Sequence, residues 1–87
     1  MKPKRGETIY YLCEDQIIAY TVGYLGEQSF IIDEYGYVIT SEFEYSDFNT
    51  VWFKNFNKAI AALRKKYGRK IKIEHNVPYM WEVVEED

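Results

Sequence analysis

The chain has 87 residues, of which 47% are apolar and 18% aromatic, and its formal net charge is −3. This length predicts one domain over residues 1–87, and the apolar content excludes a disordered segment. The single cysteine, Cys13, excludes an internal disulfide and a cysteine-rich zinc site. With no apolar run of about 18 residues and no signal-peptide pattern, the sequence predicts a cytoplasmic protein without a membrane span.

The charges are segregated along the chain. Residues 6–53 contain nine acidic residues and no Lys or Arg, whereas residues 54–72 contain eight basic residues and no acid. Residues 1–5 add three basic groups and residues 73–87 add five acids. Such asymmetry can steer charged partners, so each block is a candidate surface.

The first half of the chain is predicted to be β-structure. Short runs rich in β-branched and aromatic residues alternate with turn residues, which is typical of a small barrel. The predicted strands are residues 7–13, 17–25, 29–33, 37–45 and 50–53. Gly23 marks a bulge or bend in the second strand, and Glu42 and Glu44 are expected to face outward from the fourth.

One amphipathic helix is predicted at residues 56–67. Asn55 is a suitable N-cap, and Gly68 is expected to end the helix with a left-handed backbone. The spacing i, i+3, i+4, i+7 and i+11 gives one apolar stripe, formed by Phe56, Ala59, Ile60, Leu63 and Tyr67. Two further strands are expected, one at residues 70–75 and one at 79–84, within a C-terminal region of about 70–84.

These elements predict a mainly β fold with one helix, an α+β arrangement in which a small antiparallel barrel (about residues 7–53) carries the helix and an extra C-terminal strand or hairpin. The block at residues 47–63, "DFNTVWFKNFNKAIAAL", resembles a pattern in small, mostly uncharacterised SH3-like barrel proteins of Gram-positive bacteria and their phages. The similarity covers residues 5–67. The opening strand matches at Gly6, Glu7, Thr8, Ile9 and Tyr10, and the closing strand and helix match at Phe53, Asn55, Ala59, Ala62 and Leu63.

This chain departs from that pattern at the start of the helix, where Phe56, Asn57 and Lys58 replace the usual acidic first turn. Residues 69–87 lie beyond the shared region. The resemblance therefore implies an SH3-like barrel and a bacterial or phage source, and it carries over no functional residue.

Catalysis is not predicted. The only histidine, His75, has no second His or Cys cluster to complete a metal site or an acid–base pair, so a surface histidine is expected. Cys13 is interpreted as a small buried hydrophobe. No cofactor, metal ion or catalytic residue is predicted, and the sequence favours a protein that is not an enzyme.

The leading hypothesis is a non-catalytic protein-binding or adaptor module that acts as a monomer or homodimer. Tyr and Trp are typical interface anchors, and acidic strands offer a negatively charged surface. The candidate contact residues are Tyr10, Tyr20, Tyr37, Glu42, Glu44 and Trp52. One specific version is an inhibitor of a host defence system, such as an anti-CRISPR protein, whose acidic strands occupy a nucleic-acid groove.

The alternative hypothesis is a nucleic-acid-binding module that uses the basic helix and the segment 64–72. Basic side chains release counterions when they meet phosphates. The candidate residues are Lys58, Arg64, Lys65, Lys66, Arg69, Lys70 and Lys72. The acidic total opposes this reading, and a helix whose charges pair with the acidic barrel would explain the same residues.

Overall fold

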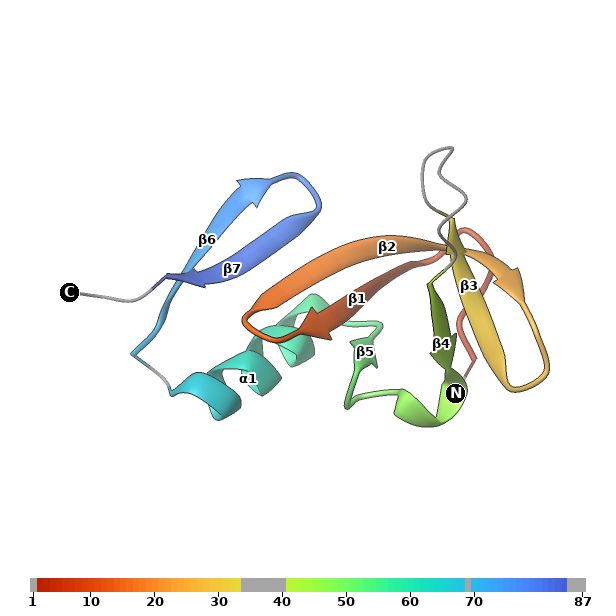
Figure 1. Ribbon diagram of the computed structural model, residues 1–87, viewed down its shortest axis with the longest axis horizontal. Coiled ribbons are helices and arrows are strands. Elements are labelled where there is room, and N and C mark those ends of the chain that lie inside the picture. Colours follow the sequence, from red (N-terminus) through yellow and green to blue (C-terminus); the bar gives the residue numbers. More distant parts are fainter. Residues whose placement is uncertain (1, 34–40, 69, 85–87) are drawn as a thin grey trace.

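The computed structural model of the chain describes residues 2–33, 41–68 and 70–84 (Figure 1). Its elements, in chain order, are β1 (Thr8–Cys13), β2 (Gln16–Leu25), β3 (Ser29–Asp33), β4 (Glu42–Glu44), the 3-10 turn η1 (Tyr45–Asp47), β5 (Trp52–Phe53), α1 (Phe56–Tyr67), β6 (Lys72–Val77) and β7 (Met80–Val84). The strands pair antiparallel in one sheet, which curls at the β3–β4 end into a half-barrel. The predicted fold class, mainly β with one helix in a small SH3-like barrel, is confirmed.

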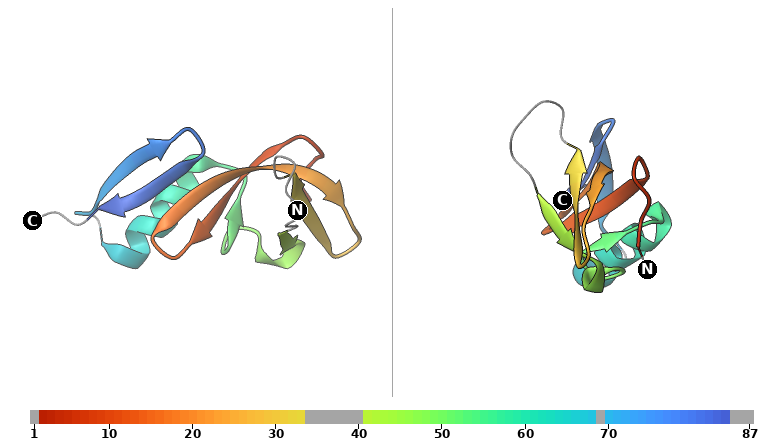
Figure 2. Two further views of the ribbon diagram at one scale, coloured as in Figure 1. Left: turned by 45° about the horizontal axis from the view of Figure 1, so that its top comes forward. Right: turned by 90° about the vertical axis from the view of Figure 1, so that its right-hand side faces the viewer.

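Strand β2 is the strand that joins the two ends of the sheet. One of its edges pairs with β1 over residues 16–21. The other edge pairs with β7 at residues 16–18 and with β3 at residues 21–25. The β6–β7 hairpin and the β3–β4 pair therefore lie at opposite ends of the same strand, as Figures 1 and 2 show.

Gly23 sits where β2 bends, as predicted. The register of β2 against β3 shifts between Val22 and Tyr24, which is a β-bulge. A Cβ at Gly23 would lie 3.2 Å from the backbone nitrogen of Asp33 and 3.3 Å from the carbonyl oxygen of Ile31. Glycine therefore permits the close approach of β3 at the point where the sheet begins to curl.

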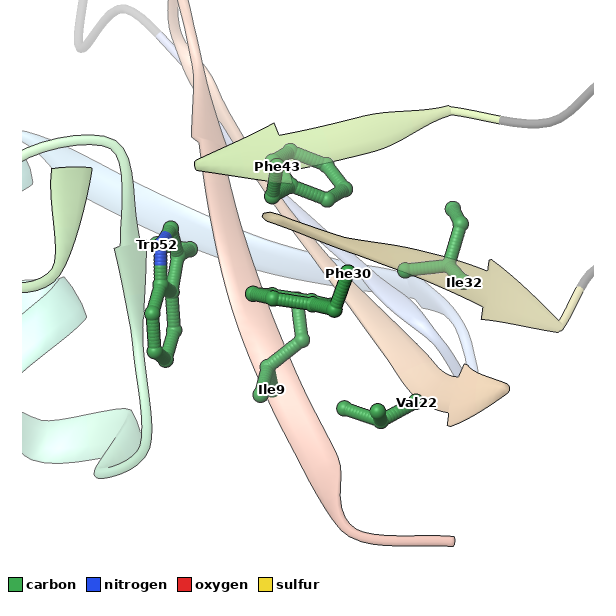
Figure 3. Close-up of a cluster of buried hydrophobic side chains, with 6 residues drawn as sticks. All are labelled: Ile9, Val22, Phe30, Ile32, Phe43 and Trp52. Atoms are coloured by element: carbon green, nitrogen blue, oxygen red, sulfur yellow. The ribbon is translucent and has the colours of Figure 1, made fainter. Parts of the chain in front are cut away.

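The sheet has a separate hydrophobic core on each face. The barrel core comprises Ile9, Val22, Phe30, Ile32, Phe43 and Trp52 (Figure 3). The helix core comprises Ile17, Phe53, Ala59 and Leu63. Strand β1 contributes side chains to both cores, because successive residues point to opposite faces. Ile9 and Tyr11 face the barrel core, whereas Tyr10 and Leu12 pack against the helix core.

Helix α1 begins and ends where the sequence predicts. The Asn55 side-chain oxygen accepts hydrogen bonds from the backbone nitrogens of Asn57 (2.8 Å) and Lys58 (3.3 Å). Gly68 follows the last turn with φ of 102°, and its N–H donates to the Arg64 carbonyl at 2.7 Å. Ala59 and Leu63 are buried, while Tyr67 is 43% exposed, so the last turn extends beyond the core.

The remaining strands differ in extent from the prediction. β5 has only two residues, because residues 49–51 form a turn instead of strand. Of the strand expected at 37–45, residues 42–44 form β4, Tyr45 begins η1, and residues 37–40 lie outside the described part. The C-terminal hairpin is present, and β6 extends two residues further than expected, to Val77.

Candidate binding surfaces

Trp52 does not belong to a binding surface, and its prediction as a contact residue is wrong. It pairs with Tyr11 across β5 and β1, and its side chain is fully buried in the barrel core. Its indole Nε1–H donates to the Glu44 carbonyl oxygen at 2.8 Å. The indole thus fills the core and ties β5 to the end of β4.

Tyr10 and Tyr20 lie on opposite faces of the sheet. Tyr10 is half-buried beside Phe56 (ring centroids 5.4 Å apart) and Trp81 (6.2 Å), at the start of the helix. Tyr20 is half-buried on the barrel-core face, 6.3 Å from the ring of Phe43. These two candidates therefore cannot contact one flat partner together, and a third, Tyr37, lies outside the described residues.

Glu42 and Glu44 are exposed, as predicted. They flank the buried Phe43 on β4, so both carboxylates point away from the barrel core. The Ser29 hydroxyl donates to Glu42, and the Ser46 hydroxyl lies 3.5 Å from Glu44. The two glutamates form an acidic edge at the end of the molecule opposite the helix.

A row of half-buried apolar side chains crosses the sheet on its barrel-core face. Tyr11 pairs with Ile18, and Ile18 pairs with Met80, so the three lie side by side across β1, β2 and β7. Tyr20 joins them two residues further along β2. Helix α1 covers the other face of the sheet, so these four side chains, which we call the open face, are left partly accessible.

The open face was not anticipated as a group, although Tyr20 was. Ile18 and Met80 belong to neither hydrophobic core. Two carboxylates, Glu74 and Glu82, oppose each other across β6 and β7 and share this face of the sheet. The surface is therefore apolar in the middle and acidic at one side.

Tyr11 has a raised pKa. A hydrogen bond with the side chain of Cys13, two residues along the same face of β1, raises the pKa of Tyr11, and burial raises it further. Cys13 itself is a free thiol that is half-buried, so it is less enclosed than the sequence predicts. The raised pKa keeps the Tyr11 hydroxyl protonated near pH 7.

The basic residues divide into separate groups. Lys58 and Lys65 lie seven residues apart on the side of α1 that faces away from the core, and both are exposed. No ion pair among the described residues involves either of them. They form one positively charged helix face.

The other basic candidates do not all join that face. Lys66 donates to the Glu14 carbonyl at 3.4 Å and lies over the Tyr67 ring, so it helps to fix the helix end to the β1–β2 turn. Arg64 and Lys70 are exposed. Lys72 lies on the opposite face of the sheet from the helix, 3.9 Å from Glu74, and Arg69 lies outside the described residues. The segment 64–72 is therefore not one continuous surface.

One ion pair of the described residues joins the basic segment 54–72 to the acidic barrel strands. Lys54, which precedes the helix, lies 3.9 Å from Glu7 and donates to the Lys2 carbonyl at 3.0 Å. A second ion pair, Lys72–Glu74, is local to β6. Lys58 and Lys65 of the helix are exposed, and neither takes part in these two ion pairs of the described residues.

His75 is exposed and stacks on Trp81, with ring centroids 4.5 Å apart and planes at 6°. Within residues 2–33, 41–68 and 70–84, no three His, Cys, Asp or Glu side chains are grouped as a metal site. In the same ranges no helix has the length and apolar content needed to span a bilayer.

No protein-family model, curated protein or solved structure matches the chain. The resemblance to small barrel proteins of Gram-positive bacteria and phages thus stays a prediction, and the surfaces above are the basis for a function.

Proposed function

We propose that this chain is a non-catalytic protein-binding module and that the open face is its contact surface. The observation that carries the proposal is the row Tyr11–Ile18–Met80, which the helix leaves uncovered. An apolar centre with a polar rim is the usual anatomy of a protein interface, and tyrosine is a common anchor there. The carboxylates of Glu74 and Glu82 favour a partner that has basic residues around an apolar contact.

The non-catalytic part of the proposal is supported by the chemistry of the described side chains. No charged or polar residue among them is buried, and the raised pKa of Tyr11 makes this group less reactive near neutral pH. Catalytic groups are tuned toward a pKa near the working pH, whereas this shift moves Tyr11 away from it.

A bacterial or phage inhibitor of a host defence enzyme, such as an anti-CRISPR protein, is one version of this function. It is supported by the exposed acids of the barrel half, including Glu42 and Glu44, which would face the basic groove of a nucleic-acid enzyme. In that version the partner is a cytoplasmic, basic protein of the host.

The test is capture of a partner from bacterial lysate, followed by titration of the identified protein against matched variants. Ile18→Ser/Met80→Ser removes apolar groups from the open face. The control, Tyr24→Ser/Leu25→Ser, removes exposed apolar groups (68% and 38% exposed) from the far end of β2. We expect the first variant to weaken binding by about tenfold or more and the second to leave it unchanged. The reverse result would contradict the open face as the contact surface.

A second function, nucleic-acid binding, is favoured by one observation: the exposed face of α1 carries Lys58 and Lys65 with no counter-charge in the described part. We expect any such binding to fall steeply between low and physiological salt, and Lys58→Glu/Lys65→Glu to abolish it. The check is fluorescence anisotropy with labelled DNA and RNA. Glu42→Lys/Glu44→Lys is the comparison variant, because it adds positive charge on β4 instead of removing it from the helix. Absence of binding at low salt rejects this second function.

A further inference from the structure

Strand β6 forms the last edge of the sheet at the hairpin end of the molecule. It pairs with β7 on one side, and no described strand pairs with its other side (Figure 1). A strand edge presents unpaired N–H and C=O groups that another strand can satisfy.

The hydrogen bonds of β7 show which residues of β6 point outward. The Val83 N–H donates to the Asp15 carbonyl of the β1–β2 turn, and the Tyr79 carbonyl accepts from the Ala19 N–H of β2, so odd-numbered residues of β7 face β2. Even-numbered residues then face β6, and Glu82 pairs there with Glu74. By the same alternation, Ile73 and His75 direct their backbone groups to the free edge, and Ile71, which immediately precedes β6, would do so if the strand were extended by one residue.

We propose that a second copy of this chain pairs antiparallel with this edge, about a two-fold axis at Ile73. In this register Ile73 exchanges backbone hydrogen bonds with the partner's Ile73. Ile71 exchanges them with the partner's His75, and the symmetric pair repeats the contact. The interface is isologous, as expected for a two-fold dimer. It is separate from the open face and does not depend on the function proposed for it.

The charges on β6 select this register. With the axis at Ile73, Lys72 lies directly opposite the partner's Glu74, and this occurs twice. If the axis lay at Lys72, the two copies of Lys72 would face each other, and if it lay at Glu74, the two copies of Glu74 would do so. With the axis at residue 71, Lys72 would face the partner's Lys70. Opposed unlike charges stabilise an antiparallel pair and like charges destabilise it, so the sequence favours one alignment.

The apolar residues agree with the same register. Ile71 and Ile73 are half-buried against the helix core. Pairing about Ile73 places this side chain beside the partner's Ile73, on the face that α1 covers. The two helix cores become neighbours across a continuous sheet. The bulge between His75 and Val77 then ends the regular pairing.

The experiment is sedimentation equilibrium of the full chain and its variants over about 10–1000 µM, the range of weak specific association. We expect the wild-type chain to reach twice its monomer mass of 10.4 kDa. In a dimer of Lys72→Glu, an acid faces the partner's Glu74 at both symmetric positions. In a dimer of Glu74→Lys, two lysines face each other at both positions. Each variant alone should therefore dimerise at least about tenfold more weakly. An equimolar mixture of the two variants restores both unlike pairs and should recover the dimer.

Two controls separate this interface from general charge effects and from misfolding. Lys65→Glu makes the same change in net charge on the helix and should leave the dimer unchanged. Lys72→Glu/Glu74→Lys in one chain exchanges the charges and should dimerise as the wild type does, with circular dichroism reporting an intact fold. A monomeric wild-type chain at about 1 mM would overturn the proposal. A dimer that neither single variant weakens would place the interface elsewhere and would also overturn it.

Discussion

The barrel half of this molecule, built around the barrel core, and the helix half, in which α1, β6 and β7 surround the helix core, are stabilised in different ways. The barrel core draws its six buried residues from five strands, and side chains tie its loops together: Trp52 Nε1 donates to the Glu44 carbonyl, and the Tyr45 hydroxyl donates to the Gly26 carbonyl at 2.7 Å. The helix half rests on a locally capped helix laid over Ile17 and Phe53. We therefore expect the barrel half to unfold cooperatively and the helix half to lose its structure gradually.

The largest expected effect comes from Trp52→Ala. Removal of a fully buried indole leaves a cavity among aromatic rings and an unpaired carbonyl at Glu44, so the free energy of unfolding should fall by about 3–5 kcal/mol. Urea denaturation followed by far-ultraviolet circular dichroism measures it. Loss of less than about 1 kcal/mol would mean that the barrel core does not carry the stability of the fold.

Leu63→Ala applies the same kind of change to the helix core. We expect a loss of about 2–5 kcal/mol, and hydrogen exchange should rise in α1, β6 and β7 more than in β3 and β4. If exchange rises equally at both ends of β2, the two cores unfold together and the contrast drawn above is wrong.

Asn55→Ala tests how far the helix half depends on its cap. Two backbone nitrogens lose their acceptor, so the unfolding free energy should drop by about 1 kcal/mol. Asn55→Asp is the matched control, because it keeps the acceptor and adds a negative charge at the helix N-terminus, where the helix dipole favours it. Thermal melts of the three chains give the comparison.

The smallest effect concerns Tyr11 at the boundary of the two halves. Its pKa is higher in the folded chain than in the unfolded one, so its contribution to stability is complete below the unfolded pKa, near 10, and is lost as the pH rises through the folded pKa. Absorbance titration near 295 nm should show a tyrosine step above the ordinary pKa of the phenol, about 10. Cys13→Ala removes the first cause of the shift and should bring that step earlier; an unchanged titration curve would reject Cys13 as the cause.

The parts of the fold that sequence predicts are those specified locally. The helix boundaries follow from Asn55, the apolar stripe and Gly68, and the bend in β2 follows from Gly23. Alternation on β4 places Glu42 and Glu44 outward without any knowledge of neighbouring strands. Each of these depends on a few adjacent residues.

The parts that sequence misses depend on pairing between distant segments. A strand as short as β5 has no periodicity, so nothing in "TVWF" indicates that Trp52 turns inward. Tyr10 and Tyr11 point to opposite faces of the sheet, and neither lies fully outside, because each face has its own core. The open face exists because β7 pairs with β2, a choice that neither strand's sequence reveals.

The position of β2 also has a consequence for how the chain folds. The β1–β2 hairpin closes through two residues, Glu14 and Asp15, and such hairpins form within about 1–10 µs. β7 pairs with β2 across all the intervening strands and the helix, a closure of much longer range. Met80 enters the open face only with β7, so the row Tyr11–Ile18–Met80 is complete only once this long-range pair has formed. If the open face is the contact surface, as proposed, a partner would distinguish the fully paired sheet from a chain in which β7 is detached.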